Sequence, residues 1–432
     1  MTDSIFNIHA LKNAGWLIAG KLVHMGLAFV VNLLTARYLG PSNYGLINYA
    51  ALYTSFFTSI ATLGLNSILV KEFVKNPNES GTTVGTAVAL QMLSGSLSAV
   101  SIVTIVFFVD AGEYLTLTVV ALYSLSLVFQ AFDSIRYWFL SRLESKYTTI
   151  ATSVGYTIVT IYKILLLVFD MDVRWFAVSN TIDYAVAAIL FLWLYKKRNG
   201  PKLHISLHKG KSLIHESKSF ILCSLMVAVY NCTDRFMLKH MLSEASVGYY
   251  ATATSLATVW TFVLAAVIDS ASPGIMQAYK HNKSRYILNN RQLYAIVFYL
   301  SIFVSSVLTI VARPAILLLY GEAYLPAARP MQVITWYTAF SYLGVARNVW
   351  VVCESKQKYL TPIYIGSAMI NVVLNFLLIP WWGATGAAVA SLVTQISTTF
   401  VFPLIIRPLR PNGLLMCQAV LLRNVLPKRK KT

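Results

Sequence analysis

The chain has 432 residues, of which 57% are hydrophobic and only 12% are charged. Soluble domains carry about twice that charged fraction, so the composition excludes an ordinary cytosolic enzyme, a disordered chain and a secreted module. Lysine and arginine outnumber acidic residues by 35 to 16, but they occur in short runs between long apolar stretches. This distribution is typical of loops beside membrane-spanning segments and argues against nucleic-acid binding.

A helix needs roughly 20 mostly apolar residues to cross the hydrocarbon layer, and twelve segments of this chain meet that requirement. We therefore expect an all-α integral membrane protein with twelve transmembrane helices. The expected spans, in chain order, are 13–36, 44–70, 84–109, 115–138, 148–169, 175–195, 219–242, 248–270, 290–312, 330–353, 360–380 and 383–406.

The distribution of basic residues predicts the orientation. With the N-terminus inside, 25 lysines and arginines fall in cytoplasmic segments and 5 on the opposite side, which predicts that both termini are cytoplasmic. The chain then divides into an N-lobe (1–195), a basic linker (196–218), a C-lobe (219–406) and a basic tail (407–432). We expect the linker and tail to be solvated anchors, with docking of anionic lipid as the alternative, and residues 414–422 to lie on the membrane interface.

The two halves carry traces of an internal repeat. Glu144-Ser145-Lys146 follows the fourth span, and Glu354-Ser355-Lys356 follows the tenth, with an offset of 210. A second match, offset by 203, pairs Leu39, Gly45 and Ala50 with Leu242, Gly248 and Ala253. These positions predict two six-helix lobes related by a pseudo-twofold axis along the membrane normal, as in many transporters.

Nine charged residues lie within or at the ends of the predicted spans. Each charge at a span centre costs roughly 2.5 to 3.5 kcal/mol to insert, so we expect the set to face a protein interior rather than lipid. Internal ion pairs that stabilise the bundle are the alternative to a functional role for any one of them. The nine are Lys21, Asp133, Arg136, Lys163, Asp183, Asp234, Arg235, Asp269 and Arg347.

An anionic ligand is the expected partner of the cations. Lys21, Lys163 and Arg347 have no acidic residue within a helical turn, and an unpaired cation in a low-dielectric interior requires an anion. We expect these three and Arg235 to form a cationic binding cavity. Polar residues on the same spans are the candidates to line it: His24, Asn32, Asn231 and Asn371, with Tyr156 and Asn375 nearby.

The acidic residues receive different expected roles. Asp133 and Arg136 have the i, i+3 spacing of a local ion pair, and Asp234 is expected to pair structurally in the same way. Asp183 and Asp269 are the candidates for coupling to H⁺ or Na⁺. The sequence contains no nucleotide-binding, hydrolase or zinc motif, and its four cysteines are scattered, so we expect no enzyme activity, metal or cofactor.

The chain resembles the Wzx-type flippases, which translocate repeat units of O-antigen and related polysaccharides and belong with the MATE exporters and lipid II flippases in one superfamily. The stretches that carry the resemblance are ARYLGPSNYG (36–45), DRFMLKHMLSEASVGYY (234–250), LYGEAYLPA (319–327) and GATGAAVAS (383–391). They are spread over both halves, so the resemblance covers nearly the whole chain.

The resemblance implies a specific activity. The substrate would be an oligosaccharide on undecaprenyl pyrophosphate, moved from the cytoplasmic to the periplasmic leaflet of the bacterial inner membrane by alternating access. A polymerase and a chain-length regulator of the same pathway would be its partners. A MATE-like ion-coupled exporter remains an alternative, and so, less strongly, does a polysaccharide polymerase or ligase, which would be expected to have a larger periplasmic loop.

Overall fold

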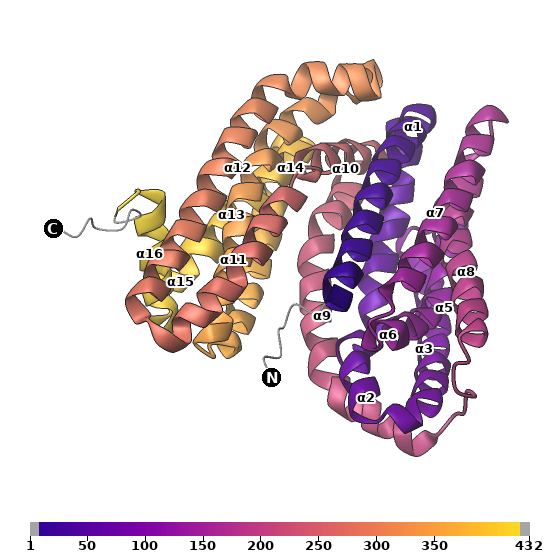
Figure 1. Cartoon of the computed structure of the whole chain (residues 1–432). Coiled ribbons are helices and arrows are strands. Elements are labelled where there is room, and N and C mark those ends of the chain that lie inside the picture. Colours follow the sequence, from indigo (N-terminus) through magenta and orange to yellow (C-terminus); the bar gives the residue numbers. More distant parts are fainter. Residues whose placement is uncertain (1–7, 424–432) are drawn as a thin grey trace. The chain divides into compact units, whose positions relative to one another are not determined.

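A computed structural model describes residues 8–423, and these residues are helical with short connecting turns and no strand (Figure 1). Six of the described helices are long and apolar enough to cross a membrane, and a bent pair makes a seventh. Side chains are described from Met25 onward, with the exception of Ser219, Leu222, Cys223, Met226, Val227, Tyr230 and Asn231.

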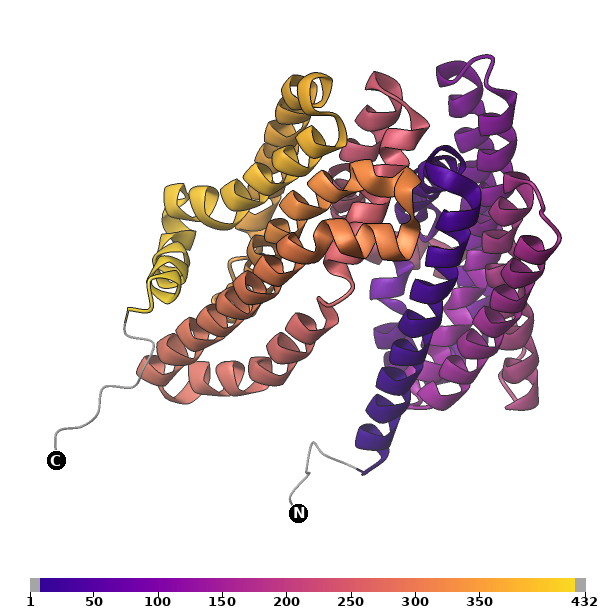
Figure 2. The ribbon, with the colours of Figure 1, turned by 90° about the horizontal axis from the view of Figure 1, so that it is seen from above.

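The chain forms two compact units, with the boundary between Cys232 and Thr233. The helices of the first unit are α1 (Ile8–Ala61), α2 (Leu69–Lys75), α3 (Ser80–Val109), α4 (Tyr114–Ser124), α5 (Ser126–Phe129), α6 (Asp133–Ser141), α7 (Ser145–Val168), α8 (Val173–Lys197) and most of α9 (Leu207–Met241). The first part of α1 runs alongside the other helices of this unit (Figure 2).

The second unit contains the end of α9 and all later helices. These are α10 (Glu244–Thr258), α11 (Phe262–His281), α12 (Lys283–Tyr320), α13 (Ala328–Cys353), α14 (Leu360–Ile396), α15 (Phe402–Ile405) and α16 (Arg410–Val420). A π-helical turn, Ser397–Val401, joins α14 to α15, and α10 meets α11 at a bend of 45°.

Two glycines explain why twelve predicted spans appear as fewer continuous helices. Gly40 interrupts α1 with φ 70°, and Gly383 interrupts α14 with φ 57°, a backbone conformation that glycine adopts without a Cβ penalty. Pro41 follows the first break, where its fixed φ suits the first turn of a new helix. With α1 and α14 divided at these residues, the helices of residues 8–423 account for all twelve spans, and the two-lobed all-α fold is confirmed.

Residues of the predicted linker pack on the first unit. The segment 201–206 runs along α3, where the amide N of Ser206 donates to Thr86 Oγ1 at 3.0 Å. Gly85 makes this approach possible, because a Cβ there would lie 2.5 Å from the His204 carbonyl oxygen. α9 then begins at Leu207, inside the predicted linker 196–218. The boundary between the two compact units follows Cys232, which lies beyond the end of that linker.

An ion cluster fixes the start of α9. Lys209 Nζ lies 2.6 Å from Glu72 Oε1 and 2.8 Å from Glu79 Oε2. Burial favours a higher pKa for Glu72, but hydrogen bonds from Lys209 and Asn76 outweigh it, so the pKa lies below its ordinary value. Burial acts to lower the pKa of Lys209, and its bonds to the two glutamates raise it above the ordinary value.

α16 packs against α12 in the second unit. Asn412 Nδ2 donates to the Tyr294 hydroxyl at 2.7 Å, and the Tyr299 hydroxyl donates to the Val420 carbonyl at 2.7 Å. Met416 is buried in the core that these helices share with α13. The segment 414–422, which the sequence predicts to lie on the membrane interface, therefore belongs largely to helix α16. This helix packs on the N-terminal part of α12, where the basic residues of α12 are concentrated.

Candidate functional site

A polar pocket lies inside the first unit. Its volume is about 200 Å³, and both parts of α1, together with α4, α7 and α8, contribute to its wall. An adjoining hollow of about 300 Å³ shares Ala51, Tyr123 and Asn180 with it. The polar and charged lining residues of the pocket are Asn32, Thr35, Tyr44, Asn48, Tyr123, Tyr156, Lys163, Ser179, Asn180 and Asp183.

The pocket contains charges of both signs. Lys163 is on α7 and Asp183 on α8, and the two side chains interact electrostatically. Asp183 also interacts with Asp133, which in turn interacts with Arg136. Two cations and two acids therefore form a connected group, and the acid that interacts with Lys163 comes from α8 rather than from its own helix.

A different arrangement surrounds Asp234 in the second unit, where the residue is only 8% exposed. Its Oδ1 accepts hydrogen bonds from Asn371 Nδ2 at 3.0 Å and from Asn375 Nδ2 at 2.7 Å. Its Oδ2 accepts from the Tyr250 hydroxyl at 2.6 Å and from the Ser391 hydroxyl. We call these five residues the Asp234 network.

The Asp234 network draws on three helices. Asp234 comes from α9 and Tyr250 from α10, while α14 supplies Asn371 and Asn375 before its break at Gly383 and Ser391 after it. Among the described residues no cation forms a salt bridge with Asp234, so its observed partners are neutral donors. These four N–H and O–H donors stabilise the charged carboxylate, so a proton or a small cation could bind it only after some of the donors turn away.

Arg347 on α13 is buried, with 1% exposure. Its Nη1 donates to the Thr398 carbonyl oxygen at 2.9 Å, and Thr398 lies in the π-helical turn Ser397–Val401. A π-turn displaces carbonyls from the regular helical pattern, so Arg347 satisfies a group that the turn exposes. Within the described chain no carboxylate forms a salt bridge with this guanidinium.

The predicted site residues fall into separate groups. The first-unit pocket brings together Asn32, Lys163 and Asp183, and the Asp234 network includes Asn371. Arg235 is half-buried beside Asp234, and Asp269 on α11 is exposed. The side chains of Lys21, His24 and Asn231 lie outside the described residues, and their predicted roles stay predictions.

Several site residues were missed from the sequence because they are neutral. Asn48, Tyr123 and Asn180 line the first-unit pocket, and nothing in their spacing distinguishes them from ordinary polar residues of a helix. The sequence did contain an indication for Tyr250 and Ser391. They end the stretches 234–250 and 383–391, which carry the family resemblance, and Asp234 begins the first of these stretches.

Several helices long and apolar enough to cross a membrane define a multi-pass membrane protein. The chain belongs to the family described as "Polysaccharide biosynthesis protein", which it matches over residues 10–278. The succinoglycan biosynthesis transport protein ExoT of Rhizobium meliloti (strain 1021) is a relative with 21% identity over 404 residues, which cover 90% of this chain and 76% of ExoT.

Solved structures show the same fold. The lipid II flippase MurJ in an inward closed conformation matches with a TM-score of 0.68 and 13% identity, over 95% of this chain and 93% of MurJ. An inward-facing MATE multidrug transporter of the MOP superfamily matches with a TM-score of 0.69 and 12% identity, over 90% of this chain and 96% of that one. At these sequence identities the two matches show a shared fold.

Proposed function

We propose that the protein is a flippase for oligosaccharide repeat units carried on undecaprenyl pyrophosphate. It moves them from the cytoplasmic to the periplasmic leaflet of the inner membrane by alternating access, for synthesis of O-antigen or another surface polysaccharide. The observation that carries the proposal is membership of the polysaccharide biosynthesis family. A fold shared with a lipid II flippase and a relative named for succinoglycan transport support it.

The first-unit pocket is the proposed contact site for the polar part of this substrate. Lys163 offers an ammonium group to the pyrophosphate, and Asp183 keeps the empty pocket close to neutral. Asparagine and tyrosine side chains around them suit sugar hydroxyls, since both donate and accept hydrogen bonds. We propose Lys21, Arg235 and Arg347 as further cations of the substrate path, with Arg347 acting through the π-turn that it supports.

The proposed direction agrees with the membrane potential. Both termini and the basic linker are proposed to be cytoplasmic, following the excess of lysine and arginine in those segments. Moving an anion outward across an inside-negative membrane gains roughly 2.3 kcal/mol per charge per 100 mV. Consumption of the product by a polymerase outside, acting with a chain-length regulator, adds to this driving force.

An ion-coupled exporter of small molecules is the second candidate, and the Asp234 network favours it. A buried carboxylate that lacks a salt-bridge partner among the described residues can exchange a proton or a cation during a transport cycle. Asp183 and Asp269 are the other proposed coupling residues, although the exposure of Asp269 gives it less reason to select an ion. Coupling of this kind is also compatible with a flippase.

Deletion of the gene in its host tests the proposal. The lipid-linked repeat unit is located with a membrane-impermeant reagent applied to each face of the inner membrane. We expect single units to accumulate in the cytoplasmic leaflet and to be cleared by the wild-type gene and by the control Arg174→Ala, but not by Lys163→Ala. Accumulation on the periplasmic face would assign the lost step to polymerisation or ligation and overturn the flippase assignment.

A further inference from the structure

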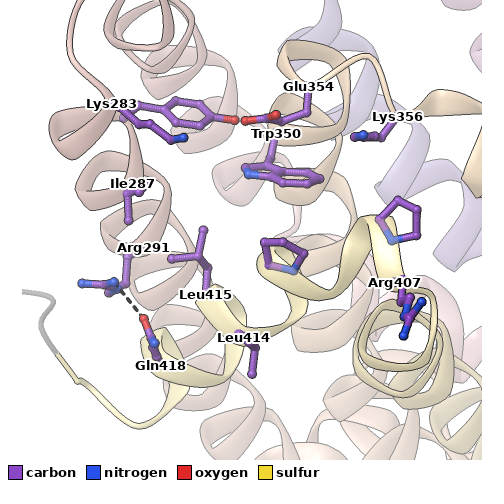
Figure 3. Close-up of a pocket in the computed structure, with 13 residues that line it drawn as sticks. Lys283, Ile287, Arg291, Trp350, Glu354, Lys356, Arg407, Leu414, Leu415 and Gln418 are labelled. Carbon is purple, nitrogen blue, oxygen red and sulfur yellow. Dashed lines mark hydrogen bonds between the residues drawn. The ribbon is translucent and has the colours of Figure 1, made fainter.

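A second pocket, of about 660 Å³, lies within the second unit at the end of α12 that carries the basic residues. Figure 3 shows Lys283 and Arg291 on one side of it and Lys356 and Arg407 on the other, with Trp350, Leu414 and Leu415 between them. The pocket belongs neither to the first-unit pocket nor to the Asp234 network. Its full lining is Lys283, Tyr286, Ile287, Arg291, Trp350, Glu354, Lys356, Arg407, Pro408, Pro411, Leu414, Leu415 and Gln418.

The charges of this pocket predict an anionic occupant. Four cations line it, and Glu354 is the one acidic residue among its lining residues, so a net charge of about three remains when both signs are counted. The cations come from three separate segments, which are the start of α12, the turn after α13 and the chain around α16. Folding therefore gathers like charges at one place, which is unfavourable unless an anion offsets them.

Hydrogen-bonding groups add to the charge. The Tyr286 hydroxyl has no hydrogen-bond partner among the described residues, although Tyr286 is only 2% exposed. A buried hydroxyl without a partner costs stability, and a phosphate oxygen is an acceptor that would remove the cost. Arg291 is held in place by its hydrogen bond to Gln418 Oε1 at 2.8 Å, so one of the four cations is already oriented.

Apolar residues between the cations distinguish a lipid from a soluble phosphate. Ile287, Leu414 and Leu415 line the same pocket as the four cations, and Leu414 is exposed. Inorganic phosphate would leave these side chains without a partner, whereas the chains of a phospholipid would cover them. The pocket also lies where the polar first turns of α12 give way to its apolar stretch, which is the level of lipid headgroups.

We propose that this pocket binds the phosphate headgroup of an anionic glycerophospholipid, with its acyl chains along Leu414 and Leu415. The bound lipid joins α16 to α12 and α13 and anchors the end of the second unit in the membrane surface. The four cations suit a phosphate and the exposed Leu414 suits an acyl chain, so charge and apolar surface together match a phospholipid. A resident phospholipid is therefore favoured over a lipid-linked oligosaccharide.

Native mass spectrometry of the full-length protein in mild detergent tests this site. The lipids are phosphatidylglycerol and the zwitterionic phosphatidylcholine. The test variant is Lys356→Gln/Arg407→Gln, and the matched control is Arg285→Gln/Lys358→Gln, which removes two exposed cations that do not line the pocket. We expect the test variant to weaken phosphatidylglycerol binding roughly tenfold or more, since each basic residue near a lipid headgroup contributes about 1 kcal/mol. The control should change it less than about twofold, and phosphatidylcholine binding should not change.

Competition experiments identify the source of the phosphate. Short-chain phosphatidylglycerol should displace the bound lipid, whereas inorganic phosphate and an acidic peptide at the same concentration should not. Tyr286→Phe should weaken phosphatidylglycerol binding without lowering the melting temperature, because the hydroxyl has no partner to lose among the described residues. Equal losses in the test and control variants would overturn the proposal, as would displacement by inorganic phosphate or by the peptide.

Discussion

The first-unit pocket and the Asp234 network differ in how they stabilise charged side chains inside a helical unit. Both place charge inside a helical unit, where an isolated charge is costly. The first-unit pocket sets Lys163 against Asp183 and stays hollow, whereas the Asp234 network surrounds one carboxylate with four neutral donors and leaves it buried. The hollow leaves Lys163 and Asp183 room to contact a polar group of a substrate, whereas the hydrogen bonds of the Asp234 carboxylate are already made to the protein.

The largest expected effect comes from removing the acceptor of the Asp234 network. Asp234→Leu leaves the donors of Tyr250, Ser391, Asn371 and Asn375 without their common acceptor, at a cost of about 3 kcal/mol or more. The free energy of unfolding in detergent measures it. Glu216→Leu is the control, because this acidic side chain on α9 is exposed. Equal destabilisation by the two variants would contradict the importance of the network.

The ion cluster of Lys209 tests how firmly the start of α9 belongs to the first unit. Lys209→Gln breaks the bonds to Glu72 and Glu79, and we expect a loss of about 2 kcal/mol. The exposed Lys211 gives the control variant Lys211→Gln, which should change stability by less than about 0.5 kcal/mol. If neither variant changes the free energy of unfolding, the ion cluster does not stabilise the packing of residues 207–218 on the first unit.

The same cluster predicts a pH dependence. The lowered pKa of Glu72 means that its contribution is present above the ordinary value of 4.5 and is lost as the pH falls through the lowered pKa. The raised pKa of Lys209 means that its contribution is present below 10.5 and is lost as the pH rises through the raised pKa. Unfolding measured below pH 4.5 should therefore be less pH-dependent in Glu72→Gln than in the wild type, and identical slopes would exclude the cluster as a cause.

A double-variant cycle tests the charge balance of the first-unit pocket. Lys163→Met removes the cation that interacts with Asp183 and should destabilise the protein by about 1 to 2 kcal/mol. Asp183→Asn in the same chain should recover most of that loss, while transport stays impaired because the ammonium group is absent. Additive stability effects in the cycle would show that the two residues do not interact.

The smallest expected effects concern the glycine breaks, one in each unit. Gly40→Ala and Gly383→Ala force an alanine into positive φ and should each cost about 1 kcal/mol. Gly274→Ala, inside α11 and in open space, should instead stabilise by roughly 0.5 to 1 kcal/mol, since glycine is a poor helix former. The melting temperature should fall for Gly40→Ala and Gly383→Ala and rise for Gly274→Ala. A change in the same direction for all three variants would contradict the role assigned to the positive φ angles.

Much of the fold could be predicted because span length and apolar content report directly on membrane crossing. The break at Gly40 falls between two predicted spans, in a stretch that contains Pro41, and the break at Gly383 falls at the first residue of the last predicted span, 383–406. The partners within the sites could not be predicted in this way. Lys163 has no acid near it in its own helix, and Asp183 comes from the next one. Spacing along one helix gives no information about contacts made across helices.

The Asp234 network shows the same limit more sharply. The sequence predicted a charged partner for Asp234, whereas the observed partners are neutral and lie up to 157 residues away along the chain. The sequence indicated Asn371 and Asn375 as polar lining residues, but tyrosine and serine are common in polar helices, so the residue types of Tyr250 and Ser391 gave no indication. Only their places at the ends of the family-like stretches distinguished Tyr250 and Ser391.

Reconstitution in vesicles tests the central proposal most directly. Purified protein is placed in liposomes that contain undecaprenyl pyrophosphate carrying a labelled oligosaccharide, and a membrane-impermeant reagent reports the fraction of label in the outer leaflet. The proposal predicts rapid exchange between leaflets with the wild type and with Arg174→Ala, and a rate roughly tenfold or more lower with Lys163→Ala, as for loss of a charged hydrogen bond to the substrate. No exchange above that of protein-free liposomes, together with ion-driven uptake of a soluble cation, would contradict it and favour the exporter.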